Sequence, residues 1–274
     1  MVAQVSALPL GLSFCIILLL AVFARLLRIL PSLAEALPTG RSARTRPSHI
    51  CIVLGSGGHT AEMLSMIRDL NPRRYTKRTY LVSSGDSFSA GKAADFELML
   101  TSKERLESNS PKDGGSSKTE TLDASRLGGT FAIITVPRAR RIHQPLCSTP
   151  FTSLQCLWAC IKTLARDDAD PLARPGCDGN VPAHATRDKH GTPDIVLTNG
   201  PATGVIVVLA VLILKFFGMQ GTGEMKTIYV ESWARVKTLS LSGRILKLGL
   251  TDRFLVQWEA LKEGRAEYRG VLVE

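Results

Sequence analysis

A glycine-rich loop between an apolar run and a helical pattern constrains this chain most. Gly55-Ser56-Gly57-Gly58-His59-Thr60 follows the apolar residues Ile50 to Leu54 and precedes residues 61–70, whose pattern is helical. A strand that leads through such a turn into a helix directs unpaired N–H groups and the positive end of the helix dipole at one point. The arrangement predicts an anion site, and phosphate fits it best. A tight strand-to-helix turn without a ligand is the alternative.

The residue types of the loop suit a diphosphate. Glycine lets the backbone approach the ligand closely, while hydroxyl and imidazole groups add hydrogen-bond donors at the first turn of the helix. The residues expected to bind the diphosphate here are Gly55, Ser56, Gly57, Gly58 and Thr60.

The N-terminus is apolar over the length of a membrane helix. The first 24 residues carry no charged side chain, and arginines begin at Arg25. A bilayer crossing needs about 20 apolar residues, so residues 1–30 are predicted to form one transmembrane anchor. Because the nearby positive charge follows the apolar run, the positive-inside rule places the rest of the chain in the cytosol. A signal peptide cleaved near Ala34-Glu35-Ala36 is the rival interpretation, although the basic segment that begins such peptides is missing.

The remainder is expected to form one domain. A Pro-, Ser- and Arg-rich linker covers about residues 31–48, and the predicted domain covers residues 49–274. Two polar segments within it, about residues 101–129 and 167–190, are expected to be flexible insertions. Roughly 170 residues remain to pack, which suits a single α/β domain.

Strand candidates alternate with helical patterns along this domain. Strands are expected at residues 50–54, 79–83, 131–136, 194–198, 226–230 and 254–257, and helices at about residues 61–70, 90–100, 152–165, 204–217 and 243–249. The alternation predicts a Rossmann-like parallel sheet with helices on both faces. The apolar run from Val205 to Leu214 is too short for a second membrane crossing and fits a buried helix better, with a helix dipping into the membrane surface as the alternative.

Charge and cysteine content narrow the function further. The net charge is +10, but the basic residues are scattered and aromatic residues make up only 6% of the chain, so attraction to an anionic membrane is favoured over nucleic-acid binding. Cys156 and Cys160 are expected on the buried face of a helix. A zinc site that joins them to His143 or His184 lacks the usual C-x2-C pairing, so buried thiols are expected instead of zinc ligands.

Polar residues follow three further strands. Pro137-Arg138-Ala139-Arg140-Arg141, Asn199-Gly200 and Glu231-Ser232 each come directly after a predicted strand. The carboxyl ends of parallel strands share one edge, so these residues are expected to surround a crevice with the glycine loop. Asn199 and Gly200 are expected at the diphosphate, and Arg138, Arg140 and Arg141 at a phosphate or headgroup. A plain turn, a solvated basic loop and an ion pair for Glu231 are the structural alternatives.

Two common nucleotide-binding motifs are excluded by their spacing. The dinucleotide fingerprint needs a small residue where Thr60 stands, and it needs an acid at the end of the second strand, whereas Asp86 lies beyond a turn. The chain contains no G-x-x-x-x-G-K-[ST] motif, so it is not a P-loop ATPase.

In their order along the chain, these motifs resemble one family. The resemblance includes the apolar anchor, the loop from Gly55 to Glu62, and the segments Pro137–Arg140, Asp194–Pro201, Tyr229–Ser232, Thr238–Arg244 and Asp252–Trp258. That family is the membrane-anchoring subunit of the endoplasmic-reticulum N-acetylglucosamine transferase of the dolichol pathway. The resemblance covers nearly the whole chain outside the two polar insertions.

The resemblance implies a reaction at the cytosolic face of the endoplasmic reticulum, with this chain as a single-pass membrane protein. GlcNAc would pass from UDP-GlcNAc to GlcNAc-diphosphodolichol, without a metal or other cofactor. A separate soluble subunit would bind the donor, while this chain would resemble the N-terminal, acceptor-binding half of a GT-B glycosyltransferase. One α/β domain cannot supply both halves of such a cleft, which agrees with the need for a partner.

The resemblance leaves the catalytic base open between two residues. His59 resembles the glycine-loop histidine of GT-B relatives, and Glu231 follows a strand at the expected crevice. A passive scaffold that only recruits a catalytic partner is the alternative function, and a stand-alone membrane-bound nucleotide-sugar enzyme is a weaker one.

The C-terminal residues are the expected partner interface. Trp258, Tyr268, Val271 and Leu272 are aromatic or branched residues near a chain end that would otherwise fray. Packing of the tail on its own domain is the alternative.

Overall fold

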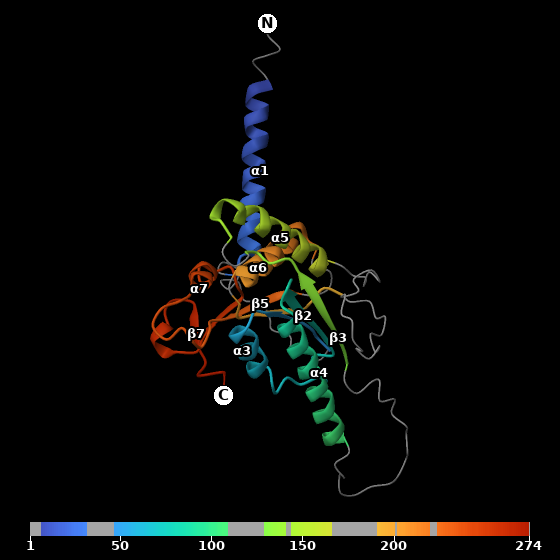
Figure 1. The fold of residues 1–274 in the computed structure, drawn as a ribbon. Helices are drawn as coiled ribbons and strands as arrows, with labels where there is room; N and C mark the ends of the chain where they lie inside the picture. Colours follow the sequence, from blue (N-terminus) through green and yellow to red (C-terminus); the bar gives the residue numbers. More distant parts are fainter. Residues whose placement is uncertain are drawn as a thin grey trace, which may run out of the picture.

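Parallel strands with helices on both faces form the part of the chain that the computed structural model describes (Figure 1). That part comprises residues 7–31, 47–108, 129–140, 144–165, 191–200, 202–219 and 224–273. Its strands are β1 (His49–Leu54), β2 (Lys77–Ser83), β3 (Thr130–Val136), β4 (Ile195–Thr198), β5 (Lys226–Val230), β6 (Arg253–Val256) and β7 (Ala266–Tyr268). Its α-helices are α1 (Ala7–Ile29), α3 (Gly58–Met66), α4 (Ser87–Ser108), α5 (Thr149–Ala165), α6 (Ala202–Phe217) and α7 (Leu241–Leu246), with short 3₁₀ helices η1 (Leu146–Ser148) and η2 (Glu259–Leu261).

The strand order confirms the expected Rossmann-like sheet. Within the described residues, seven strands pair in parallel in the order β3-β2-β1-β4-β5-β6-β7. The chain builds outward from β1 to β3 and then returns to place β4 against the other side of β1. Sheets of this type bind ligands at the carboxyl ends of the strands where the order reverses, which here is between β1 and β4.

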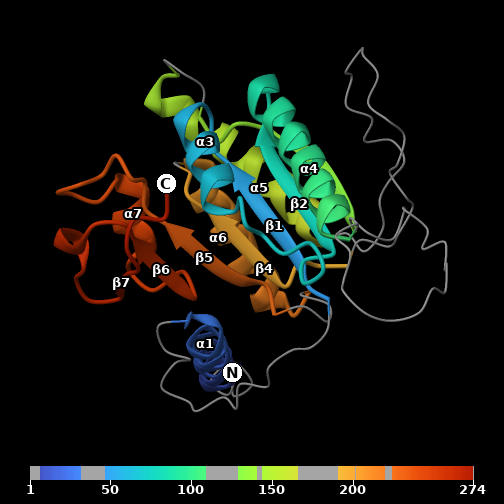
Figure 2. The ribbon, with the colours of Figure 1, turned by 90° about the horizontal axis from the view of Figure 1, so that it is seen from below.

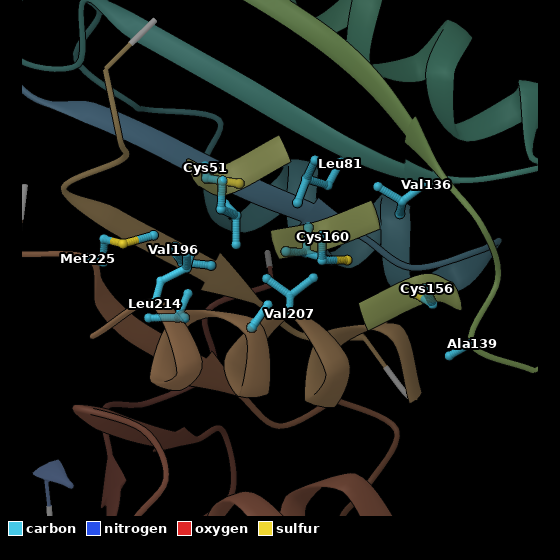
Figure 3. Close-up of a cluster of buried hydrophobic side chains, with 14 residues drawn as sticks. Cys51, Leu81, Val136, Ala139, Cys156, Cys160, Val196, Val207, Leu214 and Met225 are labelled. Carbon is cyan, nitrogen blue, oxygen red and sulfur yellow. The ribbon is translucent and has the colours of Figure 1, made fainter. Parts of the chain in front are cut away.

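Each face of the sheet has its own apolar core. Successive side chains of a strand point to opposite faces, so Cys51 and Val53 of β1 pack toward α5 and α6, whereas Ile50, Ile52 and Leu54 pack toward α3 and α4. Figure 3 shows the first of these cores, which includes Cys156 and Cys160 of α5 and Val207 of α6. The central strands are therefore covered on both sides, as their nearly continuous apolar sequence requires.

The helix predicted over residues 204–217 is buried, as expected. It corresponds to α6, in which Val207, Val211 and Leu214 are fully buried against the sheet. Cys156 and Cys160 are also fully buried, which confirms their predicted place on the inner face of a helix. His143 and His184, weighed as zinc ligands, lie outside the described residues.

Two elements differ from the sequence-based expectation. Strand β7 was not predicted, and α4 continues to Ser108, eight residues into the segment expected as a polar insertion. The extension of α4 is held by tertiary contacts: Glu104 is 5% exposed, and its Oε1 lies 3.4 Å from Arg73 Nε. The rest of that segment, the second insertion and most of the linker lie outside the described residues.

Helix α1 rises from the side of the sheet that carries α5 and α6 (Figure 1), and Figure 2 shows it almost end-on. Arg25 ties it to α6 by donating hydrogen bonds from Nε to the carbonyl oxygen of Phe216 (3.0 Å) and from Nη2 to that of Lys215 (3.1 Å). In the described part of the chain, no helix combines the length and the hydropathy that crossing a membrane requires. The transmembrane helix expected over residues 1–30 is thus not confirmed.

Candidate functional site

The glycine loop connects the end of β1 to the first turn of α3, next to the residues that follow β4. A Cβ atom at position 55 would lie 2.7 Å from the Cβ of His59 and 3.5 Å from the Cα of Gly200, so the close approach requires glycine. Gly57 has a φ of +62°, in the left-handed region that glycine adopts most readily. Nothing lies within 4 Å of where a Cβ would stand on Gly58. The loop thus leaves open space at the N-terminus of α3.

Hydrogen bonds beneath the loop fix its shape. The Thr60 hydroxyl is fully buried, donates to the carbonyl oxygen of Gly55 and lies 2.7 Å from Ser89 Oγ. Ser89 Oγ in turn donates to Asp86 Oδ2 at 2.7 Å. The Thr60 side chain is therefore used within the protein, while Ser56, Gly57 and Gly58 are exposed. Contact of these residues with a diphosphate stays a prediction.

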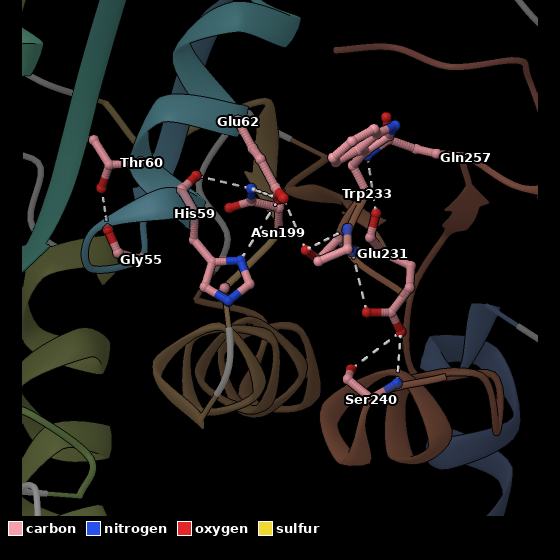
Figure 4. Close-up of polar contacts among 12 residues, drawn as sticks. Gly55, His59, Thr60, Glu62, Asn199, Glu231, Trp233, Ser240 and Gln257 are labelled. Atoms are coloured by element: carbon pink, nitrogen blue, oxygen red, sulfur yellow. Dashed lines mark hydrogen bonds and ion pairs between the residues drawn. The ribbon is translucent and has the colours of Figure 1, made fainter. Parts of the chain in front are cut away.

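Four polar residues from three strand ends meet beside the loop (Figure 4), and we refer to them as the Glu62 cluster: His59, Glu62, Asn199 and Ser232. Glu62 Oε1 accepts a hydrogen bond from Ser232 Oγ (2.9 Å), and Glu62 Oε2 accepts one from Asn199 Nδ2 (3.3 Å). Asn199 Nδ2 also donates to the carbonyl oxygen of His59 (2.9 Å). His59 Nδ1 lies 3.6 Å from Glu62 Oε2, an ion pair when the imidazole is protonated. The cluster links the ends of β1, β4 and β5.

Two buried atoms of the Glu62 cluster lack a partner. His59 Nδ1 and Asn199 Oδ1 have no hydrogen-bond partner among the described residues. Buried polar atoms are nearly always paired in folded proteins, and the exceptions concentrate at functional sites. The His59 side chain remains 33% exposed, so part of the cluster is open to a ligand.

The Glu62 carboxylate stays ionised in this setting. Burial by itself would raise its pKa, but the nearby His59 imidazole and the hydrogen bonds from Ser232 and Asn199 together lower the pKa of Glu62 below its ordinary value. A fixed negative charge therefore lies beside the imidazole.

Glu231 has different surroundings, although it lies next to Ser232. Its carboxylate is 1% exposed and accepts hydrogen bonds from Ser232 N (3.1 Å), Ser240 N (3.1 Å) and Ser240 Oγ (3.0 Å). Ser240 Oγ also accepts from Gly243 N at 2.9 Å, which caps the N-terminus of α7. A Cβ on Gly243 would lie 2.0 Å from Glu231 Oε2, so α7 and the carboxylate pack directly against each other. Glu231 thus holds α7 to the end of β5.

The predicted basic residues follow β3 and lie toward that edge of the sheet. Arg138 Nε donates to the carbonyl oxygen of Ser84 at 2.9 Å, which places its loop over the end of β2, and Arg140 Nη2 lies 3.4 Å from the carbonyl oxygen of Gln144. Neither bonds to the Glu62 cluster, because β3 is an edge strand separated from β1 by β2. Arg141 lies outside the described residues. Contact of these arginines with a phosphate or headgroup stays a prediction.

Of the residues predicted to contact a partner, some bond within their own domain and others are exposed. Trp258 Nε1 donates to the carbonyl oxygen of Trp233 (2.7 Å), and the backbone N–H of Leu272 donates to Gln257 Oε1 (3.0 Å), so the tail is held by its own domain. Tyr268 and Val271 are 38% and 39% exposed. The tail is therefore docked but leaves apolar surface accessible.

Sequence reasoning missed Glu62 as a member of the site, and it placed Ser232 at the crevice without giving it a role. The signal for Glu62 was available, because residues three apart on a helix are neighbours and His59 and Glu62 have that spacing. Ser232 follows Glu231, which the sequence analysis considered as a catalytic base instead. Its bond to Glu62 depends on the pairing of strands far apart in the chain.

Comparisons with known proteins place the chain in context. The model of the family described as "Oligosaccharide biosynthesis protein Alg14 like" matches residues 50–272. A UDP-N-acetylglucosamine transferase subunit alg14 of Aspergillus fumigatus is 37% identical over 77% of this chain and 100% of its own length. The subunit of the same name from Schizosaccharomyces pombe is 34% identical over 85% of this chain and 88% of its own. The human subunit of that name is 33% identical over 78% of this chain and 77% of its own length. No solved structure matches this chain.

Proposed function

This chain belongs to the Alg14 family, and from that premise we propose that it is the acceptor-binding subunit of a UDP-N-acetylglucosamine transferase. In the proposed reaction, GlcNAc passes from UDP-GlcNAc to GlcNAc-diphosphodolichol, the second step of lipid-linked oligosaccharide assembly for N-glycosylation. The observation that carries the proposal is the Glu62 cluster, which has two unpaired buried atoms beside an exposed glycine loop where the strand order reverses.

The glycine loop is the proposed diphosphate site. Ser56, Gly57 and Gly58 are exposed at the start of α3, and the first N–H groups of a helix, which lack carbonyl partners within the helix, suit an anion. The open space at Gly58 lets the acceptor phosphates approach the backbone. Asn199 and Gly200, packed against the loop, form the other wall of this site.

His59 is the proposed base. The acceptor hydroxyl oxygen bonds to the anomeric carbon of GlcNAc, the bond from that carbon to the UDP oxygen breaks, and the hydroxyl proton passes to His59. Glu62 lies beside Nδ1, so its charge stabilises the imidazolium that forms when Nε2 takes the proton. We assign Glu231 the structural role of holding α7, because its carboxylate already accepts several hydrogen bonds within the protein.

A soluble donor-binding subunit is the proposed partner. The relatives are named as subunits, and the described domain is a single α/β unit that would supply one wall of a glycosyltransferase cleft. Trp258, Tyr268, Val271 and Leu272 are the proposed interface. Deleting residues 268–274 should abolish co-purification of the partner from a chain that still folds, although loss of the Leu272 bond to the buried Gln257 should lower its thermal unfolding temperature. A truncated chain that unfolds, or that still holds its partner, would reject this interface.

The endoplasmic-reticulum membrane is the proposed location, with the domain on the cytosolic face. Large apolar side chains of α1 are exposed in the structure, among them Phe14 at 67% and Leu19 at 68%, and a bilayer would cover them. Protease added outside sealed microsomes should remove the domain that follows Arg25. Full protection of the domain would place it in the lumen instead.

Reconstitution separates an active subunit from a passive scaffold. The full chain and its donor-binding partner are combined in vesicles with GlcNAc-diphosphodolichol and labelled UDP-GlcNAc, and formation of the disaccharide lipid is measured. Activity should require both subunits and should fall at least tenfold with His59→Ala while the partner stays bound. Full activity of that variant would indicate that this chain only recruits its partner.

A further inference from the structure

Helix α5 has an apolar face that the described residues leave uncovered. Phe151, Leu154 and Trp158 are 65%, 63% and 61% exposed, whereas Cys156, Cys160 and Leu164 are buried against the sheet. At 100° per residue, the three exposed side chains lie on the side of α5 opposite to the three buried ones. We refer to Phe151, Leu154 and Trp158 as the α5 outer face. Isolated exposed apolar residues are ordinary, but three large ones aligned on one helix indicate a contact surface.

The α5 outer face looks in the direction in which α1 leaves the domain. Both α5 and α6 lie on the same side of the sheet, and α1 rises away from that side (Figures 1 and 2). The hydrogen bonds of Arg25 to the last turn of α6 fix the base of α1 in this layer. A membrane into which α1 inserted would therefore also lie against the α5 outer face.

The charges on this side of the sheet suit an anionic surface. The sequences of α1, α5 and α6 contain no Asp or Glu, and their charged residues are Arg25, Arg28, Lys162 and Lys215. On the other side, α3 and α4 contain Glu62, Asp95, Glu97, Glu104 and Glu107 together with Lys92, Lys103 and Arg105, and Glu97 and Glu104 are buried against arginines. A negatively charged surface is thus attracted to the side that carries α1, α5 and α6, whereas α3 and α4 present charges of both signs.

The residue types of α5 are those of helices that lie in a membrane interface. Trp, Phe and Leu form the apolar side, and Lys162 places its Nζ 5.4 Å from the centre of the Trp158 ring. An indole ring with a lysine beside it suits the headgroup region, where the ring is buried and the ammonium group stays hydrated. A protein partner would be expected to show more polar pairing around the apolar centre.

We propose that the α5 outer face is a second membrane contact, which lies in the headgroup region of an anionic bilayer while α1 anchors the chain. This inference rests on the proposed membrane-bound function. With two contacts, the domain has a fixed tilt relative to the bilayer, and the carboxyl edge of the sheet is held at a constant height above the lipid that carries the acceptor.

Fluorescence of the full chain in vesicles tests this contact. The chain contains three tryptophans, Trp158, Trp233 and Trp258. The double variant Trp233→Phe/Trp258→Phe leaves Trp158 as the only indole, and vesicles of phosphatidylcholine and phosphatidylserine carry bromine on their acyl chains near the headgroup. Trp158 emission should shift to shorter wavelength and lose at least half its intensity relative to unbrominated vesicles. Trp233, isolated by the matched variant Trp158→Phe/Trp258→Phe, should not be quenched.

Vesicle flotation in the same samples distinguishes the failure of this inference from the failure of anchoring. A chain that floats with unquenched Trp158 overturns the α5 contact alone, and a protein partner becomes the occupant of the α5 outer face. A chain that does not float overturns the α5 contact together with the proposed anchor. Equal quenching of Trp158 and Trp233 overturns the proposed orientation.

Substitution on α5 gives an independent readout. Leu154→Asp should lower transfer to a dolichol-linked acceptor several-fold but leave transfer to a short-chain, water-soluble acceptor unchanged. Leu248→Asp, at a residue that is 78% exposed beyond α7, is the matched control and should change neither rate. Equal loss on both acceptors for Leu154→Asp would overturn the proposal, because a bilayer contact has no effect on a soluble acceptor.

Discussion

Glu62 and Glu231 lie on either side of Ser232, and their surroundings differ in how completely the polar groups are paired. The Glu231 carboxylate accepts hydrogen bonds from two backbone N–H groups and the Ser240 hydroxyl, and it is almost fully buried. The Glu62 cluster instead contains unpaired atoms on His59 and Asn199 and opens to an exposed loop. A fully paired buried carboxylate stabilises a fold, whereas an incompletely paired cluster retains capacity for a ligand. Position at a strand end alone does not distinguish the two roles.

The largest expected effect is on the stability of the Glu231 side. Glu231→Ala should lower the free energy of unfolding by on the order of 3 kcal/mol, because it leaves the buried N–H groups of Ser232 and Ser240 without an acceptor. Chemical denaturation measures this, and Glu231→Gln should lose less because it keeps an acceptor oxygen. If Glu231→Ala instead unfolds like the wild type but is inactive, Glu231 belongs with the ligand and the contrast with Glu62 is wrong.

On the Glu62 side, the expected loss is in rate. His59→Ala should lower the rate of transfer at least tenfold, about 1.4 kcal/mol in the activation free energy, because it removes the proposed base. Its free energy of unfolding should change by less than about 0.5 kcal/mol, since the side chain is partly exposed. Rates are measured with the donor-binding subunit bound. A variant that loses stability rather than rate would make His59 a structural residue like Glu231.

Gly57 and Gly58 are neighbours in the loop, and substituting each of them should separate an effect on stability from an effect on acceptor binding. Gly58→Ala should keep its stability, since no atom lies within 4 Å of the added Cβ, but it should weaken acceptor binding about tenfold by filling the space proposed for the diphosphate. Gly57→Ala should cost about 1 kcal/mol of stability because of its positive φ. Denaturation and KM for the acceptor separate these effects. A fully active Gly58→Ala would show that the loop is a turn without a ligand.

The smallest expected effect is a pH dependence at Glu62. Its pKa is lower in the folded protein than in the unfolded chain, so its contribution to stability is present above the ordinary glutamate pKa and is lost as the pH falls through the lowered value. The contribution should be a fraction of a kcal/mol because solvent partly screens the group. The difference in unfolding free energy between wild type and Glu62→Gln should therefore shrink between pH 7 and acidic pH. A difference that grows toward acidic pH would mean that the Glu62 pKa is raised.

The sequence predicted the sheet because its signals are local. Gly55, Gly57 and Gly58 mark the turn after β1, and each of the six predicted strands is an apolar run bounded by turn residues. Strand β7 has only three residues, Ala266–Tyr268, and gains its definition from pairing with β6. The end of α4 has a polar sequence typical of a loop, and its helix depends on the burial of Glu104 beside Arg73. Such contacts between distant segments cannot be deduced from local composition.

The sequence predicted the glycine loop of the site but not which side chains of the site bond to one another. Both Glu231 and Asn199 follow strands, yet only the strand order shows that Asn199 adjoins the loop and that Arg138 lies beyond β2. The orientation of the Glu231 carboxylate toward α7 depends on the absence of a side chain at Gly243. Sequence spacing indicates which residues share an edge of the sheet, whereas the partner of each side chain depends on the packing of the whole domain.

The position of β1 has a consequence for how the chain is made. β1 pairs on one side with β2 and on the other with β4, so Ile50 meets Ile195. During synthesis, β1, β2 and β3 emerge first, and Cys51, Val53 and Leu81 lack their helical cover until α5 and α6 follow. At 5–20 residues per second, the roughly 80 residues between the end of β3 and the end of α6 take about 4–16 s to translate. For that interval an apolar face of the nascent half-sheet is open to water, to chaperones and to other nascent chains.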